Sequence, residues 1–537
     1  MALRLLSDAG MFFRFAAGLG RFLRSPLNEQ DCRSLIAASL EHREHNFLRL
    51  MRRAVYGYAG SPYLRLLRWA GVEYGDLERM VLADGVEGAL ARLYDAGVWV
   101  ELDQFKGQRP IERPGLFVKV RPESFDNPVL SRDFEVESGG STGPRRRMKI
   151  DFDLLAYDAA CRHFHFAAAE VADRPLGIWR GVPPDSSGLK HGLIAAKLGR
   201  PMERWFSPVP VRWDLTGLPF AALTTYAVRA SRLYGNPIPP PEHVPLGDGL
   251  PVARWLAEKV RAGTPGVLSA AANNAVRAAL AAKEAGLDIA GTVFRVSGEP
   301  FTAAKARLMA ELGVRTFSGW SMSETGPLAG ACGRREVIDE VHLFRGKIAV
   351  LQRPKRLADG ETVLDVLYLT TLLPSTPKIM LNLDSGDYGV LSRRRCGCLL
   401  EQIGFPDHLH TIRNYGKLTA GGIQFLGSEI MELVEEVLPK AFGGHATDYQ
   451  LVEYQAGELS EVSLVVSPRV RLQEESRVVQ LVLDHLASRG PGNRLMADFW
   501  KQGRTLRIER REPYVTPASK TPPLRVIKTA GDGRKRA

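Results

Sequence analysis

The stretch that most constrains the fold runs from Gly291 to Gly326 and reads GTVFRVSGEPFTAAKARLMAELGVRTFSGWSMSETG. Residues 292–296 are rich in β-branched and aromatic side chains, which predicts a strand. Thr302 suits the N-cap of a helix that Gly313 ends, and residues 314–318 predict the next strand. Because a strand–helix–strand unit almost always makes a right-handed crossover between parallel strands, we expect a parallel α/β sheet.

Polar turns follow both strands of this unit. Ser297–Pro300 (SGEP) and Trp320–Glu324 (WSMSE) are therefore expected at the carboxyl edge of one sheet, where open α/β sheets bind ligands. A third polar loop follows a predicted strand at 133–137 (DFEVE) and precedes a helical run from Phe152 to Ala172. The pattern thus predicts three loops that converge on one ligand-binding crevice.

The third loop, SGGSTGPRRR, has the composition of an anion-binding turn. Its glycines let successive backbone N–H groups converge, and its serine and threonine hydroxyls add donors. It leads directly into Arg145–Arg147, so the favoured anion is a phosphate. On composition alone, a solvated surface loop is an equally good interpretation.

The size and charge of the chain exclude some classes of protein. A length of 537 residues exceeds what one hydrophobic core usually supports, so two or three domains are expected. The net charge of +12 makes nucleic acid a partner to consider. Apart from Arg145–Arg147, Arg393–Arg395 and the C-terminal GDGRKRA, however, the basic residues are scattered and follow no recognition motif. We therefore predict no nucleic-acid partner, since attraction of anionic small molecules explains the charge equally well.

The cysteine content and the N-terminus indicate the compartment. Five cysteines in a long chain without a secretory signal favour a reducing cytoplasm. The N-terminal MALRLLSDAGMFFRFAAGLGRFLRS is apolar and basic, but arginine interrupts each apolar run. This pattern predicts an amphipathic helix that lies on the protein; a helix on a membrane surface is the less favoured alternative. It predicts no integral membrane segment.

The sequence pattern divides the chain into two unequal parts. Residues 1–412 are expected to form a large multi-layer α/β domain with mixed sheets, in which residues from about 28 to 113 are helical. A hinge is expected at 413–422. Residues 423–537 predict a small α+β cap domain, with Lys520 on a loop between prolines.

The ordered loops resemble those of the adenylate-forming ligases (acyl-CoA synthetases, luciferases and nonribosomal adenylation domains), and most of all the phenylacetate–CoA ligase branch. SGGSTGPRR resembles the family's S-S-G-T-T-G-x-P-K, with Gly139 for a serine and Arg146 at the lysine position. SGEP resembles G-G-E-P. WSMSE resembles Y-G-x-[ST]-E, with Trp320 for tyrosine and Ser321 for glycine.

A fourth motif and the order of the set strengthen this resemblance. DSGD at 384–387 resembles the family's R-T-G-D, and the likeness extends from about Tyr58 to Lys520. Each motif is weak alone, but four in the right order, followed by a small domain with an exposed lysine, are strong together. The G-x-x-x-x-G-K-[ST] loop of kinases and ATPases is not matched.

The resemblance implies an ATP-dependent reaction that converts a carboxylate into an acyl-adenylate, releases pyrophosphate and then forms a thioester with coenzyme A. The implied catalytic residues are Lys520, Glu324 and Thr142, with Glu324 holding Mg²⁺. Asp387 is implied to accept hydrogen bonds from the ribose, and Trp320 to stack on adenine. The implied nucleotide-binding residues are Ser138, Gly139, Gly140, Ser141, Thr142, Gly143, Arg146, Ser297, Gly298, Glu299, Pro300, Trp320, Ser321, Met322, Ser323, Asp387 and Lys417.

Some positions depart from the family pattern. Asp384 stands where the family has arginine, which removes a positive charge near the ribose. The hinge sequence NYGKLTAGG offers Gly416 and Lys417 but lacks the family's acidic residue. Lys528 competes with Lys520, which lacks the glycine that often precedes the family lysine. A homologue that binds nucleotide without turnover therefore stays open beside an active ligase.

Four residues have the chemistry of a structural zinc site: Cys332, His342, Cys396 and Cys398. The two segments border predicted strands, EVHLFRGKIAVLQ and DYGVLSRRRCGC, which we expect side by side. Buried apolar cysteines without a metal are an equally good interpretation, and Cys32 and Cys161 are predicted to be packing residues.

The substrate follows only in outline. The acyl pocket is expected around His163–Phe166 (HFHF), 179–194 (WRGVPPDSSGLKHGLI) and 266–274 (GVLSAAANN), whose aromatic rings suit an aryl or apolar carboxylic acid. Aromatic clusters more often belong to a core. The acceptor is coenzyme A, a carrier-protein thiol or an amine, and a homodimer is left open.

Overall fold

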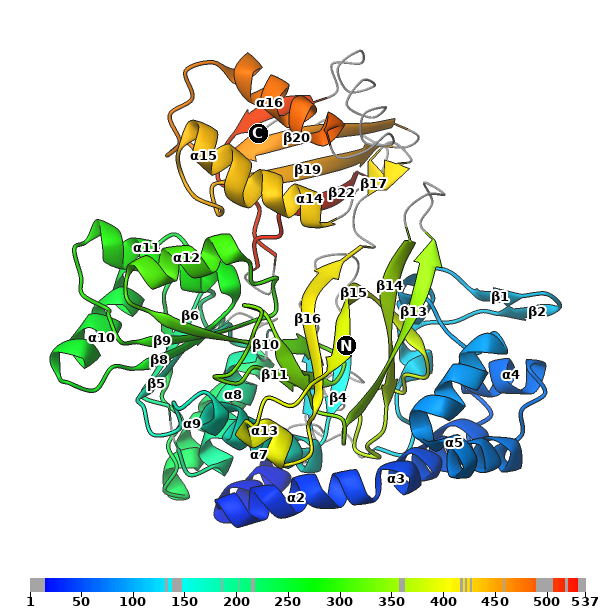
Figure 1. Ribbon diagram of the computed structural model, residues 1–537. Helices are drawn as coiled ribbons and strands as arrows, with labels where there is room; N and C mark the ends of the chain where they lie inside the picture. Colours follow the sequence, from blue (N-terminus) through cyan, green and yellow to red (C-terminus); the bar gives the residue numbers. More distant parts are fainter. Residues whose placement is uncertain are drawn as a thin grey trace.

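The computed structural model describes residues 15–130, 134–137, 147–183, 185, 187–200, 202–213, 218–356, 363–415, 419–420, 423–424, 427–456, 459–488, 506–516 and 520–529. It has a large α/β part around a twelve-stranded mixed sheet and a small C-terminal α+β part with its own four-stranded sheet (Figure 1). This is the fold class that the sequence predicts.

The N-terminal segment is helical, as predicted. Residues 15–24 form a helix whose apolar side, with Phe15, Leu19, Phe22 and Leu23, is buried. Both phenylalanine rings pack on Phe152, with centroids 5.7 and 5.0 Å from its ring, so this helix lies on the protein. The elements that follow are α2 (Glu29–Glu41), α3 (Arg43–Leu50), η1 (Met51–Tyr56), α4 (Pro62–Trp69), α5 (Tyr74–Asp95), α6 (Leu102–Phe105), β1 (Ile111–Arg113), β2 (Leu116–Val118) and η2 (Pro122–Phe125).

The large sheet has a parallel and an antiparallel half. Its order is β13-β14-β15-β16-β12-β11-β10-β9-β8-β5-β6-β7, and the strands from β10 to β7 pair in parallel. The parallel strands are β5 (Leu176–Trp179), β6 (Arg204–Ser207), β7 (Pro241–His243), β8 (Val267–Ala270), β9 (Val293–Ser297) and β10 (Arg315–Met322). The antiparallel strands are β11 (Gly326–Gly330), β12 (Val341–Leu343), β13 (Ile348–Arg356), β14 (Val363–Thr371), β15 (Leu383–Arg393) and β16 (Asp407–Asn414).

Helices cover both faces of the parallel half. The predicted crossover is present: β9 is followed by α12 and by the parallel strand β10, and every residue of β9 is buried. In Figure 1, α11 and α12 lie on one side of these strands, and α7 and α8 lie on the other. The helices are α7 (Phe152–Ala168), α8 (Ser187–Lys197), α9 (Leu218–Leu233), α10 (Leu250–Arg261), α11 (Ala272–Glu284), α12 (Ala303–Glu311) and α13 (Leu399–Gln402).

The DFEVE segment is a strand, but it does not join the parallel sheet. Here β3 (Phe134–Glu137) pairs antiparallel with β4 (Arg147–Ile150) in a two-stranded sheet of their own. Met148 pairs with Val136, and Lys149 pairs with Glu135, so the two strands form a hairpin. The glycine-rich loop therefore connects the two strands of a hairpin.

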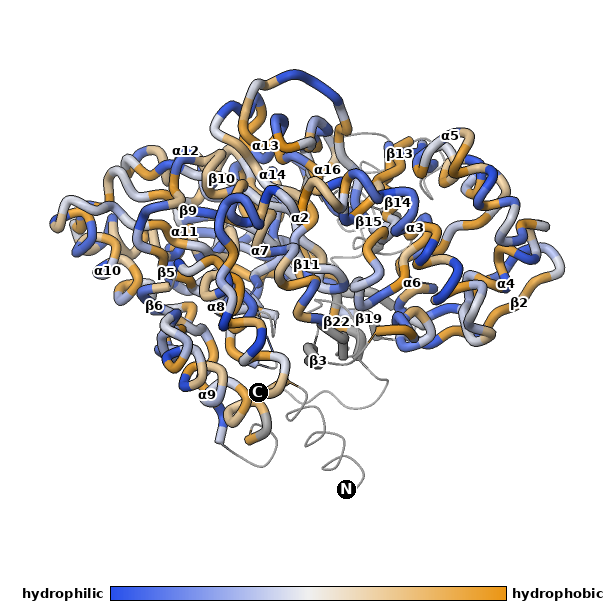
Figure 2. The backbone as a smooth tube through the Cα atoms, turned by 90° about the horizontal axis from the view of Figure 1, so that it is seen from below, coloured by the Kyte–Doolittle hydropathy of each residue, from blue (hydrophilic) through white to orange (hydrophobic). Residues whose placement is uncertain are grey.

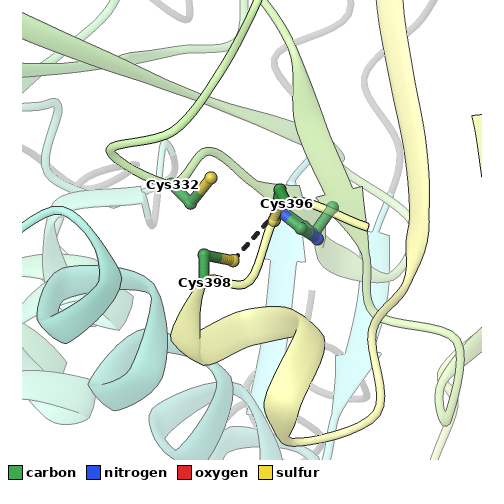
Figure 3. Close-up of side chains that lie close together, drawn as sticks. Cys332, Cys396 and Cys398 are labelled. Atoms are coloured by element: carbon green, nitrogen blue, oxygen red, sulfur yellow. Dashed lines mark hydrogen bonds between the residues drawn. The ribbon is translucent and has the colours of Figure 1, made fainter. Parts of the chain in front are cut away.

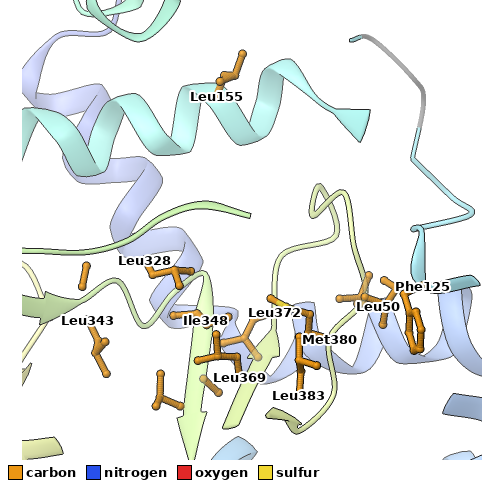
Figure 4. Close-up of a cluster of buried hydrophobic side chains, with 14 of the residues drawn as sticks. Leu50, Phe125, Leu155, Leu328, Leu343, Ile348, Leu369, Leu372, Met380 and Leu383 are labelled. Carbon is orange, nitrogen blue, oxygen red and sulfur yellow. The ribbon is translucent and has the colours of Figure 1, made fainter. Parts of the chain in front are cut away.

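The antiparallel half encloses a continuous hydrophobic core. Leu155 of α7 and Leu50 at the end of α3 pack over side chains from the strands and their connections. Figure 4 shows the labelled part of this core: Leu50, Phe125, Leu155, Leu328, Leu343, Ile348, Leu369, Leu372, Met380 and Leu383. This packing fixes the antiparallel half against the N-terminal helices.

The small C-terminal part is α+β, as predicted. Its elements are β17 (Thr419–Ala420), β18 (Ile423–Gln424), α14 (Gly427–Glu432), η3 (Leu433–Val437), α15 (Leu438–Phe442), β19 (Tyr449–Ala456), β20 (Leu459–Val466), α16 (Glu475–Ala487), β21 (Leu506–Arg510) and β22 (Leu524–Thr529). The sheet order is β21-β20-β19-β22. The prolines around Lys520 disfavour regular structure, but Pro522 and Pro523 lie before residues 524–529, which pair in parallel with β19 and form a strand.

The surface helices are amphipathic. Figure 2 shows hydrophilic and hydrophobic segments alternating along α10, and its apolar residues, such as Trp255 and Leu256, are buried. None of the helices in the described ranges combines the length and the apolar character that crossing a bilayer requires.

Candidate active site

Four parallel strands end side by side at the carboxyl edge of the large sheet. In their register, Trp179 of β5 lies opposite Ala270 of β8, and Ser297 of β9 lies opposite Gly319 of β10. The strands are therefore followed at one edge by Arg180, the N-terminus of α11, the SGEP turn and the last residues of β10. The predicted SGEP and WSMSE segments lie together at this edge.

Lys520 lies directly against the SGEP turn. Gly298 has a φ of +84°, which favours glycine, and a Cβ atom there would lie 3.4 Å from both Cε and Nζ of Lys520. Thr516 and Lys520 close their loop with two hydrogen bonds, of 3.0 and 2.7 Å. Lys528, the competing lysine, belongs to β22, where it is paired with Gln455.

Glu299 joins the turn to the lysine loop. Its carboxylate accepts hydrogen bonds from the backbone N–H of Asn273, at 2.8 Å, and from the backbone N–H of Thr521, at 2.9 Å. The Asn273 amide also donates to the carbonyl oxygen of Thr521, at 2.6 Å. Arg277 donates to the Thr521 hydroxyl at 3.2 Å. One carboxylate thus orders α11, the SGEP turn and the residue after Lys520.

A second contact between the two parts lies beside this loop. Lys305 of α12 and Glu435 of η3 form an ion pair of 2.7 Å, with side chains 2% and 5% exposed. Thr302 was expected to cap α12; it occupies the N-cap position, but its hydroxyl donates to Glu435. Lys305 also donates to the Pro300 carbonyl at 3.0 Å. The C-terminal part is therefore docked on the SGEP turn and on α12.

The WSMSE segment is mostly strand. Trp320, Ser321 and Met322 were expected in a loop, but β10 continues through Met322 because it also pairs antiparallel with β11. A register shift between Trp320 and Ser321 marks an irregularity at this point. Ser323 and Glu324 lie in the tight turn between the two strands. Glu324 is 8% exposed.

Two solved structures have the same fold over nearly the whole chain. 2-Hydroxyisobutyryl-CoA ligase in the postadenylation state, in complex with 2-HIB-AMP, matches with a TM-score of 0.53 and 16% identity over 91% of this chain and 90% of that chain. The same ligase in complex with R3-HIB-AMP matches with a TM-score of 0.52, also at 16% identity and with the same coverage. No family model matches the chain, and no curated protein matches it. The chain has the adenylate-forming ligase fold.

In this fold, the DSGD motif lies at the start of β15, between β14 and β16. Asp387 accepts a hydrogen bond of 3.0 Å from the amide of Asn414 on β16. Asp384, which stands where the resemblance expects arginine, is buried and accepts hydrogen bonds from Lys355, at 2.7 Å, and from Tyr415. The aspartate thus fixes a lysine beside it, so a positive charge remains next to this position.

Part of the predicted site lies outside the described residues. This applies to Lys417 at the hinge and to the whole glycine-rich loop between β3 and β4. The loop residues concerned are Ser138, Gly139, Gly140, Ser141, Thr142, Gly143 and Arg146.

The four predicted metal ligands come together at one point. Ligand atoms of Cys332, His342, Cys396 and Cys398 all lie within 4.8 Å of one another, and Figure 3 shows the three cysteines gathered beside α13. The His342 Nε2 atom is 3.3 Å from the Cys398 sulfur and 3.6 Å from the Cys396 sulfur. His342 Nδ1 lies 2.6 Å from the Phe405 carbonyl and donates to it, which leaves Nε2 free of a proton and directed at the thiols.

The strands that carry these ligands are arranged differently from the expectation. The EVHLFRGKIAVLQ segment forms two strands, β12 and β13, and β16 lies between β12 and β15. The cysteines nevertheless meet because Cys396 and Cys398 lie beyond the end of β15. Cys32 and Cys161 are buried, as predicted for packing residues.

The aromatic HFHF segment belongs to the core and not to a pocket. Phe164 is fully buried among the residues around Cys161, and Phe166 packs edge-on against Phe317 at 5.6 Å. The helical spacing of α7 directs these rings inward. The expectation of an aromatic acyl pocket at this segment is therefore wrong.

Sequence reasoning missed three arginines at the carboxyl edge: Arg162, Arg180 and Arg295. Arg162 and Arg295 are 6% and 3% exposed, and Arg180 is half-buried. Arg180 and Arg295 both donate to the hydroxyl of Ser297, at 2.7 and 3.1 Å. The signal was present in VFRVS, where an arginine interrupts an otherwise apolar buried strand.

Proposed function

We propose that the protein is an AMP-forming ligase that activates a carboxylic acid as its acyl-adenylate. A substrate carboxylate oxygen attacks the α-phosphorus of ATP, the bond to the β-phosphate oxygen breaks, and pyrophosphate leaves. The observation that carries this proposal is the position of Lys520, whose ammonium lies over Gly298 at the carboxyl edge. From there a mobile point charge can reach both carboxylate and α-phosphate oxygens.

The other residues at the edge would hold the nucleotide. Trp320 offers an indole ring for stacking on adenine, with the Glu299–Pro300 backbone on the other side, and Asp387 offers carboxylate oxygens to the ribose hydroxyls. The glycine-rich loop from Ser138 to Gly143, with Arg146, would hold the departing β- and γ-phosphates through backbone N–H groups and hydroxyls. The chemistry then needs mainly positioning and charge neutralisation.

Glu324 would hold Mg²⁺ beside the α-phosphate. The residues fit this hard cation, which prefers oxygen ligands, because the buried hydroxyl of the adjacent Thr325 has no hydrogen-bond partner. A carboxylate and an unpartnered hydroxyl thus lie next to each other in one tight turn. When bound, Mg²⁺ neutralises phosphate charge.

The acceptor that we propose is coenzyme A. Its thiol sulfur would attack the acyl carbonyl carbon, lose its proton and release AMP. In adenylate-forming ligases the small domain rotates to remove the lysine before this step, and here residues 413–422 would form the hinge. The ionic and hydrogen-bonded contacts of Lys305, Glu299 and Thr521 are of a kind that water can replace on such a rotation.

We also propose a structural zinc ion at Cys332, His342, Cys396 and Cys398. Three thiols and an imidazole whose other nitrogen is held by a backbone carbonyl fit a closed tetrahedral site. Zinc there would fix α13 and the end of β15 to β12.

Pyrophosphate–ATP exchange tests the adenylation step. Labelled pyrophosphate should enter ATP only when a suitable acid is present, with pools of aryl, fatty, dicarboxylic and amino acids. Lys520→Ala should abolish this exchange, whereas Lys528→Ala, the matched control in β22, should retain it. Exchange that is equally lost in both variants, or no exchange in protein shown to bind ATP, would contradict the proposal.

The acceptor is tested after an acid has been found. AMP release should be stimulated by coenzyme A and give a product that hydroxylamine cleaves as a thioester. Stimulation by amines but not by coenzyme A would show an amide-forming ligase. Stimulation by neither would favour a carrier-protein thiol.

A further inference from the structure

Three guanidinium groups gather beneath the carboxyl edge, and each comes from a different element. Arg162 lies on α7, Arg180 follows β5, and Arg295 lies within β9. The β10 backbone passes so close that a Cβ atom at Gly319 would lie 2.9 Å from Nη2 of Arg295. The strand therefore leaves room for this guanidinium only because residue 319 is glycine.

Nearby carboxylates offset these charges only in part, Asp158 for Arg162 and Asp185 and Glu299 for Arg180. Arg295 donates only to neutral groups, namely Ser269, Ser297 and His191, at 3.1 to 3.4 Å. Arg180 donates to Ser297 and to the carbonyl of Ala270, both at 2.7 Å. Within the part of the chain that the structure describes, neither these two nor Arg162 forms an ion pair.

Each arginine also keeps a buried N–H group without a partner. These atoms are Nη1 of Arg162, Nε of Arg180 and Nε of Arg295. Leaving a buried charged donor unpaired is costly, and an anion with oxygen acceptors relieves it. Burial is the main cause that lowers the pKa of Arg162 to about 10, and the positive charge of Arg180 adds to it.

The two histidines beside the arginines are arranged as neutral groups. His191 Nδ1 lies 2.8 Å from the Ser187 carbonyl, so its Nε2 is an acceptor and faces Arg295. Burial lowers the pKa of His191 and of His165 well below the ordinary value, and the neighbouring arginines add to the effect. The two histidines thus add no positive charge beside the arginines and supply no anion to them.

The position of the cluster relates it to Lys520. Nη1 of Arg180 and Nζ of Lys520 lie 3.8 and 3.4 Å from the same point, the Cβ position of Gly298. Arg180 then continues through Ser297 to Arg295. A short molecule whose reacting carboxylate lies at Lys520 therefore has its far end close to the arginines.

We propose that Arg162, Arg180 and Arg295 bind a second anionic group of the acid substrate. The substrate would be a small dicarboxylic acid, or a carboxylic acid with a sulfonate or phosphate at its far end. This inference rests on the proposed function in one respect, because it takes Lys520 as the group that faces the reacting carboxylate. It replaces the aryl or apolar acid that the aromatic residues had suggested.

The chemistry of the cluster favours this ligand. Guanidinium groups bind carboxylate, sulfonate and phosphate oxygens through paired N–H donors, and such charge-assisted hydrogen bonds are the strong ones. A neutral chain end would leave the three unpartnered N–H groups without a charged acceptor. We therefore expect discrimination of about ten- to hundredfold in favour of the second charge.

Binding is tested first, without catalysis. Calorimetric titrations would compare succinate, glutarate, phthalate and 3-sulfopropionate with methyl hemisuccinate, methyl hemiglutarate, methyl hemiphthalate and butyrate. At least one doubly anionic acid should bind tenfold or more tightly than its singly charged counterpart. Equal binding within every pair, or no response to any doubly charged acid, would overturn the inference. Loss of pyrophosphate binding in an arginine variant, with no acid responding, would overturn it too, because the cluster would then serve the nucleotide.

Variants assign the effect to the arginines. Arg162→Gln and Arg295→Gln should each remove the discrimination, and Arg295→Lys should retain part of it. Arg174→Gln is the matched control, since its guanidinium binds the Gly291 carbonyl at the opposite end of β9. A discrimination that survives both glutamine variants would place the second anion elsewhere.

Pyrophosphate exchange then separates this inference from the proposed function. Equal rates of pyrophosphate exchange with singly and doubly charged acids would support adenylation and overturn the anion site. Arginine-dependent binding of a doubly charged acid without any exchange would sustain the anion site and overturn adenylation.

Discussion

The backbone N–H of Thr521 donates to the Glu299 carboxylate at 2.9 Å, so the residue after Lys520 is tied to the turn that Lys520 covers. The same carboxylate accepts a hydrogen bond from a free N–H group in the first turn of α11, at Asn273. The proposed function uses only the backbone of Glu299, beside adenine. Here its side chain holds the two parts of the protein in one arrangement.

Glu299→Gln should slow adenylation more than later chemistry. The glutamine oxygen can replace only part of the hydrogen bonding, and losing a hydrogen bond to a charged group costs about 1.5–3 kcal/mol. We expect pyrophosphate exchange to fall by about ten- to hundredfold, whereas thioester formation from added acyl-adenylate, for which the lysine withdraws, should change little.

The control for this variant is Glu284→Gln, an exposed glutamate at the far end of α11. It should leave both half-reactions unchanged. Equal effects of Glu299→Gln on the two half-reactions would mean that the Glu299 carboxylate does not act by positioning Lys520.

The Lys305–Glu435 pair should contribute strongly to the docked arrangement. Both side chains are almost fully buried, so Lys305→Met leaves a carboxylate without its cation, which costs about 3–5 kcal/mol. We expect faster proteolysis between the two parts and weaker exchange. The double variant Lys305→Met/Glu435→Leu should recover part of the loss.

Arg307→Gln provides the comparison on the same helix. Its pair with Glu436, at 3.3 Å, is exposed, and pairs of this kind contribute less than about 1 kcal/mol. Similar effects from Arg307→Gln and Lys305→Met would mean that burial does not set the strength of the contact.

Much of the fold could be predicted because its signals are local. The β-branched and aromatic residues at 292–296 and the helical period after Thr302 define β9 and α12 within a few residues, and they place the SGEP turn at the sheet edge. β22 could not be found in this way, because its parallel pairing with β19 is a long-range contact. The extension of β10 through Met322 likewise depends on its pairing with β11.

The candidate site shows the same difference between local signals and long-range contacts. The positions of Lys520 at the SGEP turn and of Glu324 in the turn after β10 could be predicted from the ordered motifs, whereas their catalytic roles stay predictions. Arg162, Arg180 and Arg295 lie 133 positions apart at most and share no local pattern, so only the fold brings them together. The cluster of Cys332, His342, Cys396 and Cys398 could be predicted from residue type, although the strand order that unites these residues could not.

Removal of the zinc ligands should lower stability and leave the chemistry itself intact. Cys398→Ser is expected to lose one metal ion per chain by elemental analysis and to lower the melting temperature, because α13 and the end of β15 lose their connection to β12. Residual folded protein should still exchange pyrophosphate. Cys161→Ala, at a buried cysteine outside the cluster, should retain the metal. A wild-type protein free of zinc after expression with zinc would refute the site.

His165 should make the protein sensitive to mild acid. Burial is the main cause that holds its pKa well below the ordinary 6.5, and the charges of Arg295 and Arg162 add to it. The folded protein therefore keeps this imidazole neutral, while the unfolded chain binds a proton below about pH 6.5. Since the unfolded state then holds more protons, stability is unaffected above that pH and falls below it, by up to about 1.4 kcal/mol per pH unit.

Melting temperatures between pH 7.5 and 5.5 would measure this effect. His165→Gln should fall less steeply on acidification than the wild type, because its side chain takes up no proton in either state. His243→Gln, at an exposed position on β7, should follow the wild type. Carboxylates contribute equally to all three proteins, so the difference in slope isolates His165. Identical slopes would mean that the buried imidazole takes up a proton in the folded protein despite the arginines around it.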